Sequence, residues 1–169
     1  MIRDERSADA AAIRAVLEAA FPQSVEADLV DKLRLACAER VSLVAVEDDR
    51  VVGHILFTPA TIERPAGPLA GYGLAPMAVL PEFQNRGIGS ALVRAGIERL
   101  RRSRCPFVIV LGHPEYYPRF GFVRASTHGV RCQWDGVPDD AFMVLILEAS
   151  IASQVAGLAK YRREFDEAD

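Results

Sequence analysis

The sequence is poor in the residues that build metal sites and disulfides. It contains three cysteines, three histidines and one tryptophan among 169 residues. The cysteines are Cys37, Cys105 and Cys132, and neither they nor the histidines show the spacing of zinc ligands. We therefore expect no metal site. An odd number of cysteines without a Cys-x-x-Cys pair is typical of reduced thiols in a cytoplasmic protein.

Lysines and long apolar runs are also scarce. Lys32 and Lys160 are the only lysines, so the sequence has no Gly-x-x-x-x-Gly-Lys phosphate-binding loop. The longest apolar run, residues 141–147, is far shorter than the ~20 residues of a membrane helix, and the charged start predicts no secretory leader. The net charge of −3 gives no general basicity. We expect neither a membrane nor a nucleic acid as a partner.

What is present is the composition of one globular domain. Hydrophobic residues make up 50% of the chain and charged residues 25%, as in ordinary folded proteins. We expect a single domain over residues 1–169, in which residues 148–169 form a C-terminal extension.

The pattern of apolar residues predicts the order of the elements. We expect a short strand over 3–6, helices over 7–22 and 24–40, strands over 41–47, 50–62 and 72–80, a helix over 86–103, and strands over 107–111 and 141–147. Ser7 and Ser24 are the expected helix N-caps, and Asp48-Asp49 is the expected turn of an antiparallel hairpin. This order predicts an α/β layered domain with a mixed, mostly antiparallel sheet.

The start of the helix over 86–103 is unusual. Gly87 and Gly89 would each cost roughly 0.8–1.0 kcal/mol relative to Ala inside a helix. No acidic residue meets the positive end of the helix dipole there, and Arg86 lies at that end instead. An anion bound by backbone N–H groups explains both choices, and a pyrophosphate is the anion we expect. An ordinary loop with Asn85 as N-cap is the alternative. A dinucleotide-binding glycine pattern is excluded because position 92 is Leu.

Pro76 lies inside the strand expected over residues 72–80. Proline has no N–H to donate, so it predicts a gap in pairing beside Met77, Ala78 and Val79. Backbone groups left free in such a gap can bind an extended ligand as an added strand would. An edge strand is the alternative explanation.

Two motifs resemble a known family. Residues 74–89, Leu-Ala-Pro-Met-Ala-Val-Leu-Pro-Glu-Phe-Gln-Asn-Arg-Gly-Ile-Gly, resemble the acetyl-CoA signature of the GNAT superfamily of N-acetyltransferases. Residues 117–122, Tyr-Pro-Arg-Phe-Gly-Phe, are similar to the Tyr-x-x-x-Gly-Phe element of that family. The resemblance covers residues 2–148 and is strongest to the YhbS-like branch.

The resemblance implies a fold with helices on both faces of the sheet and with splayed fourth and fifth strands. It implies that acetyl-CoA is the cosubstrate, without a metal. Tyr117 falls at the position of the general acid. The implied cofactor-binding residues are Met77, Ala78, Val79, Gln84, Asn85, Arg86, Gly87, Ile88, Gly89, Ser90 and Tyr117.

The implied reaction is direct transfer of the acetyl group, through a tetrahedral intermediate, to an amine of a small molecule, peptide or protein. Relatives often place an acidic residue on the fourth strand, but residues 72–80 contain none. Glu82 is our candidate base, with Glu26, His113 or an ordered-water path as alternatives. A non-catalytic acyl-CoA sensor is the alternative function. Many relatives pair through the C-terminal region, so a homodimer is compatible with the resemblance.

Overall fold

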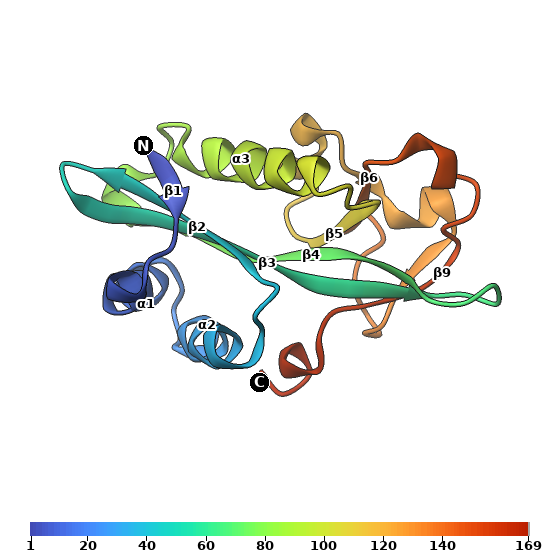
Figure 1. The fold of residues 1–169 in the computed structure, drawn as a ribbon, viewed down its shortest axis with the longest axis horizontal. Helices are drawn as coiled ribbons and strands as arrows, with labels where there is room; N and C mark the ends of the chain where they lie inside the picture. The colour runs from blue at the N-terminus through green and yellow to red at the C-terminus, as the bar shows by residue number, and fades with distance from the viewer. Residues whose placement is uncertain (169) are drawn as a thin grey trace. The chain divides into compact units, whose positions relative to one another are not determined.

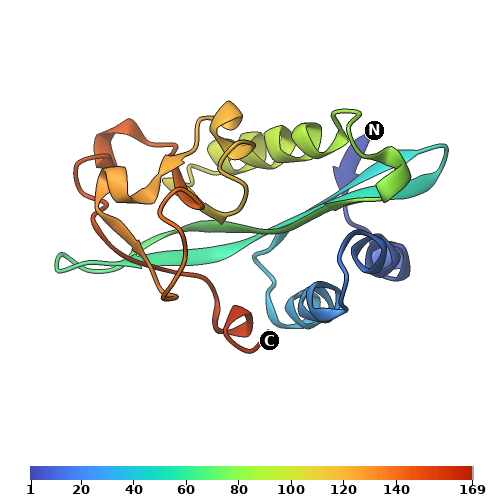
Figure 2. The ribbon, with the colours of Figure 1, turned by 180° about the vertical axis from the view of Figure 1, so that it is seen from behind.

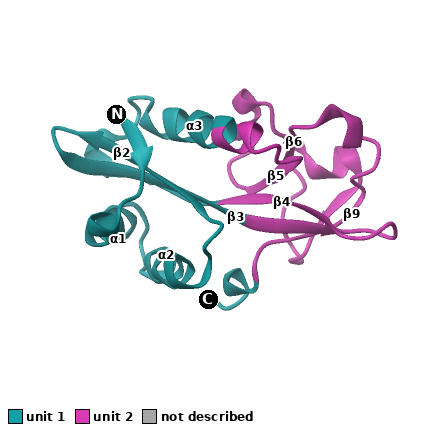
Figure 3. Ribbon diagram, in the orientation of Figure 1, with its two compact units in different colours: residues 1–58, 75–98, 163–169 teal, residues 59–74, 99–162 magenta. Residues whose placement is uncertain are grey.

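A computed structural model describes residues 1–168, and Asp169 lies outside the described residues. The chain forms two compact units, coloured separately in Figure 3. Unit 1 contains residues 1–58, residues 75–98 and the chain from residue 163 onward. Unit 2 contains residues 59–74 and 99–162.

Three long elements run from one unit into the other, namely β3 (Arg50–Glu63), β4 (Leu69–Val79) and α3 (Ile88–Arg102). The other elements of unit 1 are β1 (Ile2–Asp4), α1 (Ala10–Ala20), α2 (Val25–Ala36) and β2 (Val41–Glu47). The other strands of unit 2 are β5 (Phe107–Leu111), β6 (Val123–Arg124), β7 (Val130–Cys132), β8 (Phe142–Ile146) and β9 (Gly157–Lys160). Short 3-10 helices lie at Ser7–Asp9, Pro81–Phe83, Tyr117–Phe120, Ala125–His128, Ala149–Ile151 and Arg163–Phe165.

The strands pair in the order β1-β2-β3-β4-β5-β8-β6, and β9 pairs with β3 and β7. Pairing is parallel between β4 and β5 and between β7 and β9. It is antiparallel between β1 and β2, β2 and β3, β3 and β9, β5 and β8, and β6 and β8. The predicted mixed, mostly antiparallel sheet is therefore confirmed, including the parallel pair that α3 connects.

In unit 1, helices cover both faces of the strands. Helices α1 and α2 lie against one face and α3 lies against the other (Figures 1 and 2). Gly96 of α3 packs against the ring of Phe57 on β3, where an added Cβ would clash. The apolar stripes expected on the first two helices are buried, with Ile13 and Leu33 fully covered. The predicted hairpin is present, and its turn residues Asp48 and Asp49 have φ values of 49° and 61°.

Several predicted boundaries were wrong. Ser7 is not an N-cap: it is the first residue of a 3-10 helix, and Asp9 is the N-cap residue of α1. The carboxylate of Asp9 accepts the backbone N–H of Arg6 at 2.7 Å and binds the Arg3 guanidinium at 2.7 Å. The hydrogen bond from Arg3 lowers the pKa of Asp9 to about 2. The second helix ends at Ala36 and not near residue 40. Helix α3 begins at Ile88, so Arg86 and Gly87 precede it.

The C-terminal segment is more structured than expected. β9 pairs with the end of β3 from Thr61 to Glu63 and with all of β7. Val155 is fully buried just before β9 and Tyr161 is buried just after it. The segment expected as an extension over 148–169 thus supplies a strand and core residues to unit 2. Cys37, Cys105 and Cys132 are free thiols. Within the described residues, no helix is long and apolar enough to cross a membrane.

A buried polar cluster lies at the centre of unit 1. Ser42 Oγ donates to Glu5 Oε1 at 2.7 Å and lies 2.8 Å from Nε2 of His54, which is fully buried. Because the serine proton is directed to Glu5, Nε2 of His54 must be the donor to Ser42. Nδ1 of His54 then carries no proton, and no described residue hydrogen bonds to it. Burial lowers the pKa of His54 to about 4, although Glu5 acts in the opposite direction.

We predict that His54→Gln flattens the pH dependence of stability in acid. Unfolded histidine takes up its proton near ~6.5, whereas His54 in the folded protein does so near 4. Between these values the unfolded state binds more protons, so the free energy of unfolding falls as the pH falls, by at most about 1.4 kcal/mol per pH unit. Denaturant titrations from pH 7 to 4 measure the slope. The exposed His113, changed to Gln, should keep the wild-type slope, and an equal change in both variants would contradict the prediction.

Candidate active site

β4 extends beyond the end of β5, its parallel partner strand. Its pairs with β5 are Tyr72–Val108, Gly73–Ile109 and Leu74–Val110, and β5 ends one residue later at Leu111. By this register, residues 76–79 of β4 would oppose residues 112–115, which are outside β5. The backbone of Met77, Ala78 and Val79 therefore has no β5 residue as a ladder partner. Pro76, joined to Ala75 by a cis peptide bond, lies where this stretch begins.

The turn between β4 and α3 combines two left-handed residues. Asn85 has a φ of 63° and Gly87 a φ of 83°. A Cβ added to Gly87 would meet no atom within 4 Å, so backbone conformation rather than space requires glycine there. Gln84 Nε2 donates to the carbonyl of Val79 at 3.0 Å and so fixes the start of the turn to the end of β4. The first N–H groups of a helix have no carbonyl partners within it, and no acidic residue lies in the first turn of α3.

The sequence predicted a helix-propensity cost for both Gly87 and Gly89, but only Gly89 lies inside the helix. Gly89 lies in the first turn of α3, whereas Gly87 belongs to the left-handed turn before it. Asn85 is likewise in the left-handed region and is not an ordinary N-cap. Glycine at position 87 is therefore explained by the left-handed geometry of the turn and not by an effect on helix stability. The absence of an acidic side chain remains as expected.

Positive charge is held next to this turn by an aromatic ring. The guanidinium of Arg86 lies 5.2 Å from the centroid of the Phe83 ring, and that of Arg50 lies 5.7 Å from it. Arg50 also pairs with the exposed Glu82, with 3.3 Å between Nη2 and Oε1. The sequence pattern had not singled out Phe83 or Arg50, because their contact joins residues far apart in the chain.

Tyr117 lies in unit 2 on the short helix Tyr117–Phe120. Its side chain is buried, and its ring lies so close to Gly112 that a Cβ there would clash. The ring makes edge contacts with Phe122 at 5.7 Å and with Tyr116 at 5.1 Å between centroids. Burial, with a smaller contribution from Tyr116, raises the pKa of Tyr117 to about 12. The hydroxyl therefore stays protonated at neutral pH.

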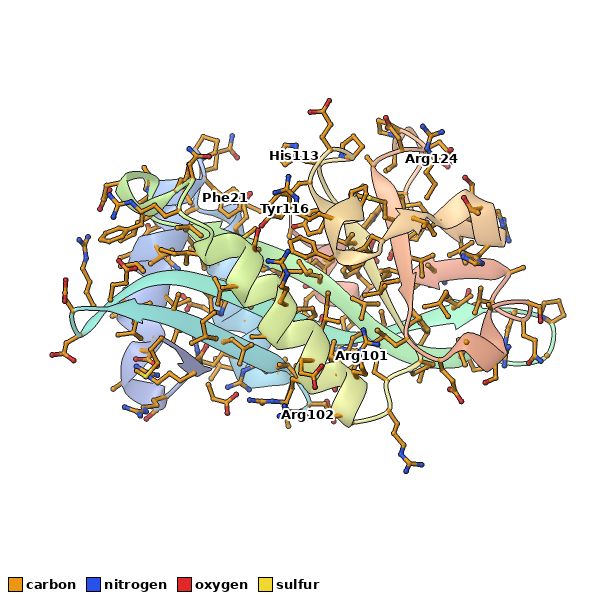
Figure 4. The ribbon with its side chains drawn as sticks, turned by 90° about the horizontal axis from the view of Figure 1, so that it is seen from above. Phe21, Arg101, Arg102, His113, Tyr116 and Arg124 are labelled. Atoms are coloured by element: carbon orange, nitrogen blue, oxygen red, sulfur yellow. The ribbon has the colours of Figure 1, made fainter. Side chains whose placement is uncertain are left out.

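The predicted site residues divide between the two units. Met77–Val79, Glu82 and residues 84–90 all belong to unit 1, where Gln84 joins the strand end to the turn. Tyr117 belongs to unit 2. Of the alternative bases, Glu26 is half-buried in the first turn of α2, and its Oε2 is buried with no described hydrogen-bond partner. His113 is exposed at the loop that leads to Tyr116 (Figure 4). Among the described residues, no cluster of His, Cys, Asp and Glu could hold a metal ion.

The turn, the unpartnered strand end and the buried tyrosine occur in the order of one enzyme family. A family model described as an acetyltransferase (GNAT) domain matches residues 1–125. The chain belongs to this family.

Relatives of the GNAT chain extend the match over nearly its whole length. It is 35% identical over 167 residues to the uncharacterized N-acetyltransferase YhbS of Escherichia coli K12, covering 98% of both chains. The crystal structure of Escherichia coli YhbS in complex with CoA has a TM-score of 0.91, with 34% identity over 98% of this chain and 91% of that one. A GNAT acetyltransferase of Brucella melitensis in complex with acetyl-CoA has a TM-score of 0.80, with 37% identity over 98% and 97% of the two chains. The expected fold and the YhbS-like branch are both confirmed.

Proposed function

We propose that this GNAT chain transfers an acetyl group from acetyl-CoA directly to the nitrogen of an amine. The observation that carries the proposal is the left-handed turn at Asn85 and Gly87, fixed to β4 by Gln84. Such a turn opens a helix whose N–H groups favour an anion, and no acidic side chain competes for that place. YhbS and the Brucella melitensis protein, crystallised with CoA and acetyl-CoA, indicate which anion this is.

Each part of the cosubstrate has proposed partners. The backbone of Met77, Ala78 and Val79, which has no β5 partner, would hold the pantetheine arm and the acetyl carbonyl by strand-like hydrogen bonds. The residues proposed to hold the pyrophosphate are Gln84, Asn85, Arg86, Gly87, Ile88, Gly89 and Ser90. The Arg86 guanidinium is oriented by the Phe83 ring, which supports a further charge contact with the phosphates.

The acceptor amine must be neutral before it attacks. A lysine-type amine has a reference pKa of ~10.4, so a base has to remove its proton at neutral pH. We propose Glu82 as this base: it follows the strand that carries Met77–Val79, Arg50 holds its carboxylate, and its exposure lets it pass the proton to water. The nitrogen then attacks the acetyl carbonyl to form a tetrahedral intermediate, whose oxyanion the backbone N–H groups at Val79 would stabilise. The carbon–sulfur bond breaks when this intermediate collapses and the carbonyl re-forms.

Tyr117 is proposed to assist departure of the sulfur. Its hydroxyl is protonated at neutral pH because burial raises its pKa to about 12. A thiol has a reference pKa of ~8.5, so complete proton transfer from Tyr117 would be uphill. The hydroxyl therefore acts by a hydrogen bond that strengthens as negative charge builds on sulfur. The final proton on the thiol comes from solvent.

The finer expectations about partners stay predictions. The net charge of −3 suits cationic amines, but a field of this kind bears on encounter rates rather than on identity. A homodimer, a single domain over residues 1–169 and a cytoplasmic location likewise remain expectations from the sequence.

We predict that CoA, and not ATP, stabilises the protein, and that acetyl-CoA releases thiol with at least one amine. Ligand at ~100 times its dissociation constant adds about 2.7 kcal/mol to the free energy of unfolding, which thermal shifts detect. Thiol release is followed with small amines, polyamines, aminoglycosides and peptide N-termini. Stabilisation by CoA without thiol release on any acceptor would favour the sensor, and stabilisation by ATP alone would overturn both functions.

Gly87→Ala should weaken CoA binding, whereas Gly67→Ala, also at positive φ and in open space, should not.

We predict that Tyr117→Phe lowers kcat by ~10²–10⁴ while CoA still binds, because the donor to sulfur is lost and the ring remains. Stopped-flow thiol release gives kcat, and calorimetry gives the dissociation constant of CoA. Tyr72→Phe, a half-exposed tyrosine on β4, is the control. Loss of activity in Tyr116→Phe instead would transfer the role to Tyr116.

We predict that Glu82→Gln lowers kcat by ~10²–10⁴ at neutral pH and that activity recovers as the pH approaches the pKa of the amine. The amide cannot accept the proton, but at high pH the acceptor is already neutral. The pH profile of kcat/KM measures the recovery. Glu26→Gln is the matched comparison, since the Glu26 carboxylate has a buried oxygen without a described partner. A larger loss in that variant would move the base to Glu26.

A further inference from the structure

The C-terminal segment places a buried hydroxyl at the end of the β4–β5 pair. Tyr161 follows β9, and its hydroxyl lies 3.1 Å from the carbonyl oxygen of Leu74 and 3.3 Å from that of Ile109. Burial raises the pKa of Tyr161, and the backbone of Leu111 partly opposes this rise. One side-chain hydroxyl thus contacts backbone groups of both strands.

These backbone groups belong to the last rung of the β4–β5 ladder. Leu74 lies opposite Val110, and rungs between parallel strands are slanted by one residue, so the carbonyl of Leu74 faces the amide of Leu111. The hydroxyl of Tyr161 lies within hydrogen-bond distance of one carbonyl on each strand, those of Leu74 and Ile109. It therefore bridges the two strands at their last paired residues.

The ring of Tyr161 is held firmly enough for this role. Its backbone N–H donates to Gln133 Oε1 at 2.6 Å, and its ring stacks on Trp134 with 5.7 Å between centroids. It also fills the space over Gly73, where any Cβ would clash with it. Every one of these partners belongs to unit 2. Loss of the hydroxyl alone would therefore leave the ring in place and change the rung.

The bridged strand end leads directly to Tyr117. Leu111 is followed by Gly112, against which the ring of Tyr117 packs. Ionisation of Tyr117 would raise the pKa of Tyr161, which places the two phenols near each other. A shift of Leu111 toward Leu74 would move the surface on which Tyr117 rests.

We propose that Tyr161 is a positioning residue for acetyl transfer: its hydroxyl bridges the last rung between β4 and β5 and thereby sets the position of Tyr117. The proposal rests on the proposed function, in which Tyr117 assists the departing sulfur. Tyr161 touches backbone and not substrate, so it acts through Tyr117. Misplacement of a catalytic group by about 1 Å can cost ~10²-fold in rate.

A double-mutant cycle tests this coupling. Tyr161→Phe should lower kcat by about ten- to a hundredfold in the wild-type background, because the hydroxyl bridge that fixes the end of β5 to β4 is then lost. In the Tyr117→Phe background the same change should cost less than about threefold, because the group that it positions is absent. Equal losses in the two backgrounds, or full activity of Tyr161→Phe, would overturn the proposal. A purely structural role would give independent losses.

Controls distinguish a loss of positioning from a loss of stability and from a failure of the proposed function. Val155→Ala makes a cavity in the same C-terminal segment and should lower the melting temperature without lowering kcat. Should Tyr161→Phe fail to fold by circular dichroism, Gln133→Leu loosens the same ring and should show the same non-additivity. Failure of the wild-type protein to bind CoA would remove the proposed function. Normal binding and turnover with additive losses would remove only the role of Tyr161.

Discussion

β5 is shorter than β4 and ends before it, and the proposed site depends on this difference in length. The register ends with Leu74 opposite Val110, while β4 continues to Val79. Unpaired backbone groups in a sheet are costly to leave without partners. The carbonyl of Val79 accepts a hydrogen bond from Gln84, and in the proposed site an extended ligand would satisfy the backbone groups of Met77–Val79 that have no β5 partner. A strand with full pairing would be more stable and could not bind in this way.

The charge distribution of α3 follows the same division between stability and binding. Its last turn carries Arg99, Arg101 and Arg102, which suits the negative end of the helix dipole (Figure 4). Its first turn carries no acidic residue to suit the positive end. The side-chain charges of α3 thus complement the helix dipole at the C-terminus but not at the N-terminus. This terminus follows the turn at Asn85 and Gly87, where the proposed pyrophosphate would supply the negative charge that the first turn lacks.

Sequence reasoning succeeded where the signal was local. The apolar stripes predicted α1 and α2, the run over 107–111 predicted β5 to the residue, and the glycine pattern located the turn. It failed for β9, because the short segment Gly157–Lys160 is a strand only through its pairing with β3 and β7. The contacts of Asp9 were missed for two reasons: the backbone N–H that its carboxylate accepts belongs to the neighbouring Arg6, which was assigned to a strand, and its ion-pair partner Arg3 is on another element.

The candidate site was likewise predictable only where the signal came from neighbouring residues in the sequence. Asn85 could have been recognised as a left-handed residue, since asparagine tolerates positive φ more readily than most residues. The contact between Arg50 and Phe83 could not, because it forms only where the chain after β4 meets the start of β3, as the bond from Leu80 N–H to the Val52 carbonyl shows. Tyr161 was beyond reach for the same reason: its hydroxyl partners lie 87 and 52 residues away in the chain.

If Tyr117 acts as the proposed donor to the departing sulfur, its burial has two opposing effects on catalysis. It raises the pKa to about 12, which keeps the hydroxyl protonated but makes it a weaker acid. The same burial excludes water, and a hydrogen bond to a developing thiolate is stronger in such surroundings than in solvent. The balance favours a donor that stabilises charge without giving up its proton. Such a donor must be accurately placed, because a hydrogen bond weakens steeply with angle and distance. The Tyr117 ring packs tightly against Gly112, which fixes the ring relative to the end of β5. Accurate placement of the hydroxyl then requires that the end of β5 is itself held in position.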